Sequence, residues 1–158
     1  METVITYGTF DYFHYGHYNY LKQAKALGDY LIVGVSTDAL CEKKGKKPIL
    51  SQQERYNIIA SLKFVDKVIF ENSFEQKIDD VDRYGVTIYA DGEDYKDLFP
   101  KSEVYKILKN KCKIIFLKRT FGVSTTQLKE NLKIQMGLDK NQESLRNKTN
   151  VIRQEKEK

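Results

Sequence analysis

The two histidines of the chain, His14 and His17, are separated by only two residues and follow a short apolar run at residues 4–5. Gly8 allows the chain to leave a strand tightly, and a helical pattern begins near Tyr18. The start of a helix carries unpaired N–H groups and the positive end of the helix dipole, so it favours anions. The spacing therefore predicts a phosphate-handling site in which imidazole N–H groups stabilise developing negative charge.

A pair spaced His-x-x-His is also compatible with half of a metal site, or with two hydrogen-bonded surface histidines. A zinc site needs further soft ligands, and the two cysteines, Cys41 and Cys112, lie far along the chain. The pattern therefore favours phosphate over a metal, and no residue is predicted as a metal ligand. Isolated cysteines are also typical of proteins from a reducing compartment.

A basic loop at residues 43–48 follows an apolar strand predicted at residues 30–35. Lysine-rich loops are usually solvated, which is one interpretation of this segment. The other interpretation follows from its place, because α/β proteins bind ligands at the carboxyl ends of central strands. Lysines at such a position could reach a triphosphate without needing rigid geometry.

Arg55 occupies an unusual position for a cation. Ser51 and Glu54 have the spacing of a capping box, which places Arg55 in the first turn of the helix that follows. A positive charge is unfavourable there unless an anion is nearby.

Two later segments carry further polar groups at the ends of predicted strands. Three acids surround Gly92 at residues 91–94, which indicates either a magnesium or ribose partner or an ordinary acidic turn. Ser124 and Gln127 have capping-box spacing, and Arg119 precedes them, so a helix dipole, hydroxyls and a guanidinium can converge on one phosphate. The alternative is that Ser124 is only an N-cap. Two helix starts that could each bind a phosphate, in one domain, favour the interpretation as a phosphate-binding site.

Buried strands that alternate with helices are needed to position these groups. Strands are predicted at residues 4–5, 30–35, 67–70, 87–90 and 112–117, with helical patterns between them, one of which starts from a capping box at residues 73–76. The alternation predicts an α/β fold, a Rossmann-like three-layer sandwich with a five-stranded parallel sheet. The carboxyl ends of its strands should line one crevice.

The bulk properties fit a single domain. The 158 residues predict one domain at residues 1–136 and a polar, flexible tail at residues 137–158. The net charge of +5 is too modest to indicate a nucleic-acid binder, and RNA binding by the tail is the weakest alternative. The chain has no long apolar stretch and no basic-then-apolar leader after Met1, so a cytoplasmic protein without membrane contact is expected.

The motif at residues 8–17 resembles a known signature. Gly-Thr-Phe-Asp at residues 8–11, followed by His-Tyr-Gly-His at residues 14–17, is similar to the G-T-F-D-x-x-H-x-G-H signature of the HxGH cytidylyltransferase family. The run at residues 119–126 resembles the second signature of that family, and the similarity extends over about residues 4–132. By size, the chain is most similar to a bacterial subgroup of small homodimers that make CDP-glycerol for cell-surface polymers.

The resemblance implies transfer of CMP from CTP, with Mg²⁺, to a small phosphorylated acceptor. Glycerol 3-phosphate is the expected acceptor, and phosphoglutamine, phosphocholine, phosphoethanolamine or another polyol phosphate, in capsule or lipid precursor synthesis, is the alternative. A nucleotide-binding module without turnover remains as a rival from another class. By position, the resemblance implies catalytic roles for His14, His17, Lys44 and Arg119. It implies substrate-binding roles for Thr9, Phe10, Asp11, Gly16, Lys46, Arg55, Lys77, Asp94, Thr120, Gly122, Ser124 and Thr125.

Several positions depart from the family pattern. Lys63 stands where an arginine is usual, and a lysine cannot grip a phosphate with two parallel hydrogen bonds. Phe74, Glu93, Tyr95 and Phe121 also replace usual residues. These changes affect the expected acceptor side more than the phosphate motifs, so they leave the choice of acceptor open.

Overall fold

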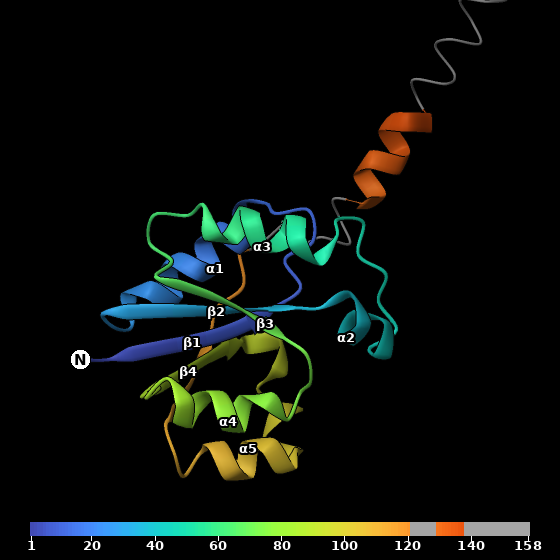
Figure 1. The fold of residues 1–158 in the computed structure, drawn as a ribbon. Coiled ribbons are helices and arrows are strands. Elements are labelled where there is room, and N and C mark those ends of the chain that lie inside the picture. The colour runs from blue at the N-terminus through green and yellow to red at the C-terminus, as the bar shows by residue number, and fades with distance from the viewer. Residues whose placement is uncertain (121–128, 138–158) are drawn as a thin grey trace, which may run out of the picture. The chain divides into compact units, whose positions relative to one another are not determined.

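A parallel five-stranded sheet is the centre of the computed structural model, which describes residues 1–120 and 129–137 (Figure 1). The strand order is β3-β2-β1-β4-β5, and every pair of neighbours runs parallel. The strands are β1 (Thr3–Gly8), β2 (Tyr30–Ser36), β3 (Lys67–Glu71), β4 (Ile88–Gly92) and β5 (Lys113–Leu117). The predicted α/β fold and all five predicted strands are therefore confirmed, with small shifts at their ends.

The central strands form a sheet because their apolar side chains are buried on both faces. On one face, Val4 and Leu31 pack in a core with Leu21 and Ile59, which come from helices α1 (Tyr15–Ala26) and α3 (Gln52–Ala60). On the other face, the core of Ile5 and Ile32 contains apolar residues of helices α4 (Gln76–Arg83) and α5 (Glu103–Leu108). Figure 1 shows these two helical layers on either side of the sheet, which is the predicted three-layer sandwich.

Local capping explains where the helices begin. α3 starts after Ser51 with the predicted capping box. α1 starts three residues earlier than predicted because His14 is its N-cap. α4 starts at Gln76, later than predicted, although the Ser73 hydroxyl accepts the Gln76 N–H at 3.2 Å. The short helix α2 (Asp38–Lys43) was not predicted, and Thr37 caps it by accepting the Leu40 N–H.

The strand order reverses beside β1, which places the candidate segments at one edge of the sheet. The chain runs from β1 to β2 and β3 on one side, and then crosses to β4 and β5 on the other. Ligands of open α/β sheets bind outside the carboxyl ends of the strands at such a switch point. The segments that follow β1, β2, β4 and β5 all leave from this edge, as predicted, and α2 lies beyond it (Figure 1).

Residues 1–123 form one compact unit, and residues 124–158 belong to a second. Of the second unit, residues 129–137 are described, and they form a helix whose side chains are mostly exposed. The predicted tail lies outside the described residues except for Gly137. Within residues 1–120 and 129–137, no helix is both long and apolar enough to cross a membrane.

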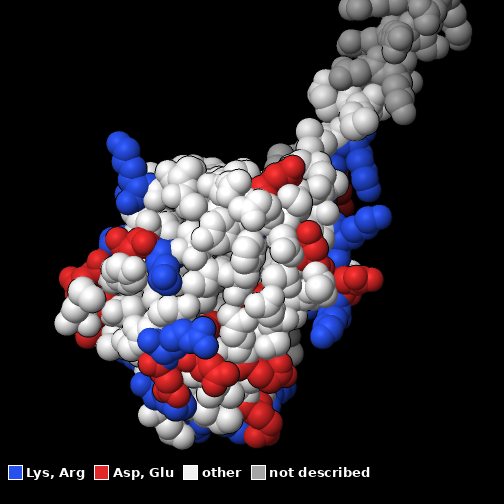
Figure 2. All heavy atoms as spheres, in the orientation of Figure 1, with Lys and Arg blue, Asp and Glu red and all other residues white. Residues whose placement is uncertain are grey.

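Charged side chains are mixed on the face of the molecule that Figure 2 shows. Lysines and arginines alternate with acidic side chains there, and a broad central area carries few charges. A continuous basic surface, which a nucleic-acid binder would use, is not visible on this face.

Candidate active site

The two histidines cap the same helix. The His14 Nδ1 atom accepts the Gly16 N–H at 3.0 Å, and the His17 Nδ1 atom accepts the His14 N–H at 3.3 Å. Together these bonds form a capping box at the start of α1, built from imidazoles instead of the usual hydroxyl and carboxylate. The rings stack with centroids 3.8 Å apart. The pair is therefore fixed in place by the start of α1.

The hydrogen bonds of the two rings determine what each ring can donate. A neutral imidazole carries one proton, and Nδ1 is an acceptor in both rings, so the proton lies on Nε2. Burial, followed by the charge of His14, lowers the pKa of His17 to about 3. Burial, followed by the charge of Arg119, also lowers the pKa of His14. Both rings are therefore neutral donors through Nε2–H near pH 7.

The loop before α1 has a constrained backbone. Phe10 and Tyr12 have φ angles of 54° and 48°, in the left-handed region that is uncommon for residues other than glycine. The buried Phe10 ring fills the space beside Gly8, where an added Cβ atom would lie 2.8 Å from the ring. The same ring meets the His17 imidazole edge to face at 5.5 Å. Phe10, predicted to bind substrate, thus packs in the core and supports His17.

Asp11 connects the loop between β1 and α1 (residues 9–14), here called the histidine loop, to the basic loop at residues 43–48. Its carboxylate is buried and accepts the N–H groups of Ile49 and Leu50 at 2.9 and 3.0 Å. These two residues come just after the lysine-rich segment that the sequence singled out. Asp11 therefore fixes the path of the basic loop relative to the helix that carries the histidines.

Arg55 ties together several chain segments inside the protein. Its side chain is 0% exposed, and its guanidinium donates to the backbone carbonyls of Thr9, Ser36 and Leu50. A fourth bond, of 2.7 Å, reaches the Asp38 carboxylate. The anion that the sequence required near Arg55 is therefore Asp38, and the guanidinium has no exposed surface in this structure.

The segment after β5 lies against α1. Asn19 donates its side-chain N–H to the Thr120 hydroxyl at 3.3 Å, and Gln23 donates to the Lys118 carbonyl at 3.1 Å. Arg119 lies between these two anchors, and its guanidinium pairs with Asp94. Because the charge of Arg119 also lowers the pKa of both histidines, the predicted residues Arg119, Thr120 and Asp94 lie on the same side of the site as the histidine pair.

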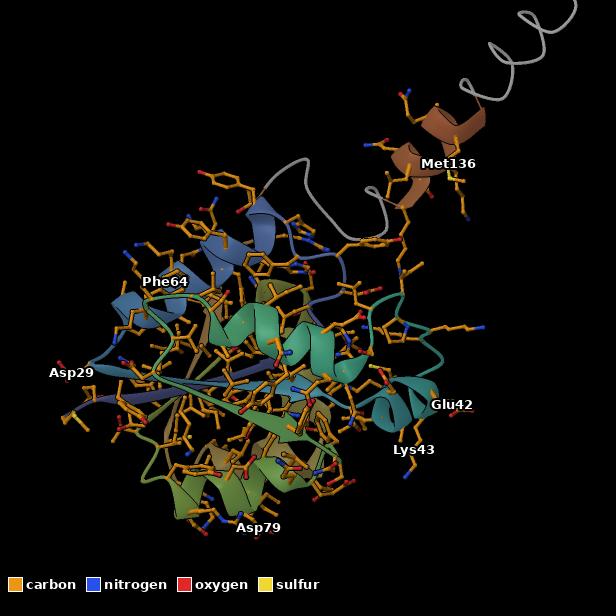
Figure 3. All side chains as sticks on the ribbon, turned by 45° about the horizontal axis from the view of Figure 1, so that its top comes forward. Asp29, Glu42, Lys43, Phe64, Asp79 and Met136 are labelled. Atoms are coloured by element: carbon orange, nitrogen blue, oxygen red, sulfur yellow. The ribbon has the colours of Figure 1, made fainter. Side chains whose placement is uncertain are left out.

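The predicted lysines occupy different environments. Lys46 is exposed on the loop after α2, whereas Lys44, at the end of that helix, has a side chain that is 36% exposed and pairs with Glu71. Lys43 points away from the sheet (Figure 3). The Lys77 ammonium is buried, bonds to Glu71 and lies over the rings of Tyr7 and Phe74.

The three acids around Gly92 do not form one cluster. Asp94 pairs with Arg119, and Glu93 accepts the Arg119 backbone N–H at 3.2 Å. Asp91 lies deeper, and burial raises its pKa to about 6. Within residues 1–120 and 129–137, no group of three or more histidine, cysteine or acidic side chains is close enough together to hold a metal ion.

The predicted residues thus form two groups at one edge of the sheet. His14, His17, Asp11, Arg119 and Asp94 make the first group, with Gly16 in the first turn of α1 between the two histidines. Lys44 and Lys77 meet at Glu71 in the second group. The sequence analysis missed Asn19, which lies within α1, and Glu71, for which a polar residue at the end of a strand was the only signal. Gly122, Ser124 and Thr125 lie outside the described residues.

Comparison with known proteins establishes the family. The model of the family described as "Cytidylyltransferase-like" matches residues 5–131, which includes both groups of the site. The chain belongs to the cytidylyltransferase-like family. The resemblance inferred from the two signatures is therefore confirmed.

Individual relatives of this cytidylyltransferase-like chain agree with the family assignment. A glycerol-3-phosphate cytidylyltransferase from Bacillus spizizenii is 46% identical over 132 residues, which cover 84% of this chain and 98% of the relative. The ethanolamine-phosphate cytidylyltransferase of Mus musculus is 37% identical over 121 residues, 77% of this chain but only 30% of the mouse protein. A lipopolysaccharide core biosynthesis protein from Thermoplasma volcanium has a similar structure, with a TM-score of 0.66, 33% identity and coverage of 76% and 98% of the two chains.

The lowered pKa of His17 predicts a pH dependence of stability. In the unfolded chain this histidine binds a proton near pH 6.5, whereas in the folded protein it stays neutral down to about pH 3. Between these values the unfolded state binds more protons, so the His17 contribution to the free energy of unfolding is present above pH 6.5 and falls as the pH is lowered. Urea unfolding at a series of pH values measures this change.

A matched variant isolates the histidine in that experiment. The raised pKa of Asp91 acts in the opposite direction, because the folded state then binds the extra proton between about pH 4 and pH 6. His17→Gln keeps an acceptor for the His14 N–H but does not titrate. Wild type should therefore lose stability relative to His17→Gln from pH 7 toward pH 5, and a difference that stays constant over this range would contradict the pKa assignment.

Proposed function

We propose that this chain is a cytidylyltransferase that transfers CMP from CTP to glycerol 3-phosphate, which gives CDP-glycerol and pyrophosphate. The observation that carries the proposal is the capping of α1 by His14 and His17, whose Nε2–H groups are donors beside Arg119. The acceptor is supported by the relative from Bacillus spizizenii, which is named for glycerol 3-phosphate and is matched over 98% of its length.

The reaction is a single in-line displacement. An oxygen of the acceptor phosphate attacks the α-phosphorus of CTP, a new P–O bond forms, and the bond to the β-phosphate breaks as pyrophosphate leaves. The attacking oxygen is already anionic, so neither a general base nor a covalent enzyme intermediate is required. Catalysis therefore depends on alignment of the two anionic substrates and on stabilisation of the charge that moves onto pyrophosphate.

The residues of the site have separate roles in this reaction. His14 and His17 donate Nε2–H bonds to phosphate oxygens. Both rings are already neutral before CTP binds. Arg119 exchanges its exposed partner Asp94 for phosphate or nucleotide oxygens. Lys44 and Lys46 reach the triphosphate or the acceptor phosphate from the basic loop. Gly122, Ser124 and Thr125 keep the nucleotide-binding roles implied by the second signature.

Four of the predicted substrate-binding residues hold the other groups of the site in place. Phe10 supports the His17 ring, and Asp11 fixes the end of the basic loop. Arg55 joins the backbone of Thr9 in the histidine loop to the end of β2 through Ser36. Thr9 contributes its carbonyl to this link. Such supports matter because a small misplacement of reacting groups greatly reduces the rate.

Mg²⁺ is expected to bind together with CTP. Magnesium usually keeps several waters and is held by substrate phosphates with one or two carboxylates, so a dedicated protein cage is not required. The carboxylates after β4 fit this pattern, since Glu93 and Asp94 are exposed at the edge where the triphosphate would lie. The ion would neutralise charge on the triphosphate when bound.

A panel of acceptors tests the proposal directly. Pyrophosphate release should be fastest with CTP and glycerol 3-phosphate, and slower with phosphoethanolamine, phosphocholine, phosphoglutamine and other polyol phosphates. ATP, GTP and UTP in place of CTP serve as controls for the nucleotide. Faster release with phosphoethanolamine would favour the second candidate, which the mouse relative at 37% identity supports. If no acceptor releases pyrophosphate, the chain is a nucleotide-binding module without turnover.

We also propose that the protein is a cytoplasmic homodimer that supplies CDP-glycerol for cell-surface polymers or capsule. The proposal of a dimer is supported by exposed aromatic residues at the start of α1, where Tyr15 and Tyr18 stack and Tyr18 meets Phe64 edge to face. Light scattering should give twice the chain mass of 18.5 kDa, and a value equal to one chain would contradict the dimer.

A further inference from the structure

Glu71 places a buried carboxylate at the carboxyl end of β3. Its side chain is 1% exposed, and one oxygen accepts a hydrogen bond of 2.9 Å from the Ser36 hydroxyl at the end of β2. The other oxygen accepts a bond from the Lys77 ammonium on α4. The ammonium of Lys44, at the end of α2, lies 3.7 Å from the first oxygen. Three different elements thus direct polar groups at this one carboxylate.

A contribution to the stability of the fold does not explain why a buried carboxylate is paired with two ammonium groups. Removing charges from water costs several kcal/mol for each ion, and apolar replacements of buried ion pairs are often neutral or stabilising. The two lysines also differ in what they can reach. Lys77 is nearly buried between Glu71 and two aromatic rings, whereas the side chain of Lys44 keeps 36% of its surface exposed. Lys44 is therefore the member of the cluster that can meet a substrate.

Among the residues that the structure describes, little besides Glu71 fixes the direction of Lys44. It follows a helix of six residues, and the next residue, Gly45, has a φ angle of 73° and has nothing near its missing side chain. A lysine carries its charge on a flexible chain of four carbons, so its ammonium has no preferred direction without a partner. The Glu71 carboxylate supplies that partner, and it is itself held from two sides by Ser36 and Lys77.

We propose that Glu71 is a positioning residue that holds the Lys44 ammonium toward the triphosphate and the acceptor phosphate, while Lys77 and Ser36 hold Glu71. This inference rests on the proposed transfer of CMP. It assigns Lys77 an indirect role, through Glu71, in place of the direct contact with the acceptor that the resemblance implied. Because both lysines share one carboxylate, the cluster keeps a net positive charge that suits two anionic substrates.

A double-mutant cycle tests whether Glu71 acts through Lys44. Wild type, Glu71→Gln, Lys44→Met and the double variant are compared by kcat and by KM for CTP and glycerol 3-phosphate. Glu71→Gln should lower kcat/KM by roughly tenfold, below the hundredfold that a displacement of 1 Å can cause. In the Lys44→Met background the same substitution should change kcat/KM by less than about twofold, because Lys44 is no longer there to be positioned.

Asp80→Asn is the matched control for loss of a buried carboxylate. Asp80 is 3% exposed on α4 and accepts bonds from Tyr7 and Gln76. It has no bond to Lys44, so this variant should keep kcat/KM within about twofold of wild type. If the Asp80→Asn and Glu71→Gln variants lose activity equally, general loss of core charge explains the result and the inference is overturned.

Further outcomes separate the inference from the proposed function. If the effects of Glu71→Gln and Lys44→Met multiply fully, Glu71 does not act through Lys44 and the inference fails, although the transferase activity stands. If thermal unfolding shows that Glu71→Gln does not fold, Ser36→Ala takes its place in the cycle, because it loosens the carboxylate without removing the charge. A wild-type protein that releases no pyrophosphate with any acceptor overturns the proposed function and this inference with it.

Discussion

Replacement of His17 by alanine is expected to slow CMP transfer by about 100-fold or more. The imidazole donates through Nε2–H to charge that develops on the phosphates, and loss of one such preorganised donor typically raises the barrier by roughly 3 to 4 kcal/mol. The effect should appear mainly in kcat, because the donor acts most strongly on the transition state. Pyrophosphate release with CTP and glycerol 3-phosphate measures it, and near-wild-type turnover would contradict the role.

A second substitution separates chemistry from helix capping in this prediction. His17 also accepts the His14 N–H through Nδ1, so alanine removes a capping bond together with the donor. Glutamine at the same place in a capping box can accept that N–H, but it does not carry the imidazole donor. His17→Gln should therefore unfold close to wild type at pH 7 and still lose most of its turnover. Recovery of turnover in this variant would show that the loss of the capping bond alone explains the slow turnover of His17→Ala.

The sequence predicted the architecture well because the signals for it are local. Continuous apolar runs identified the strands of the parallel sheet, and Ser51 with Glu54 identified the start of α3. The start of α1 was misplaced because a histidine is not among the usual N-cap residues, so His14 was not recognised as a cap. The short helix α2 was missed although Thr37 is an ordinary N-cap, because the lysine run behind it looked like a loop.

The site was predicted only in part because its supports join residues far apart in the chain. The motif identified His14 and His17, but not that Asn19 would anchor the segment after β5, which begins almost a hundred residues later. Glu71 gave no local signal except its position at a strand end, since its partners come from β2, α2 and α4. Such contacts depend on the strand order, which single-residue patterns do not contain.

Arg55 illustrates the same limit and leads to the largest expected effect on stability. The sequence correctly required an anion near this cation, but the resemblance implied that a substrate would be contacted. In the structure the guanidinium is fully buried and bonded to Asp38 and to three backbone carbonyls. These carbonyls belong to the histidine loop, to the end of β2 and to the loop before α3, so one side chain fixes three parts of the site.

Arg55→Met is therefore expected to destabilise the protein by about 3 kcal/mol or more. Methionine fills much of the volume but leaves buried carbonyl oxygens without a donor, and each such group costs roughly 1 to 3 kcal/mol. For a chain of this size, that loss lowers the melting temperature by about 6 °C or more. Calorimetry or urea unfolding measures the change. Arg83→Ala on the exposed end of α4 is the control and should stay within about 0.5 kcal/mol of wild type.

Kinetics of the same variant distinguish a support from a substrate contact. If Arg55 only fixes the backbone, the folded fraction of Arg55→Met should bind CTP with a KM within a few-fold of wild type at low temperature, where most molecules are folded. A residue that directly grips a phosphate would raise that KM strongly while leaving the unfolding free energy almost unchanged. A large rise in KM together with wild-type stability would therefore show that the guanidinium leaves its buried position to bind substrate, and that Asp38 is only its resting partner.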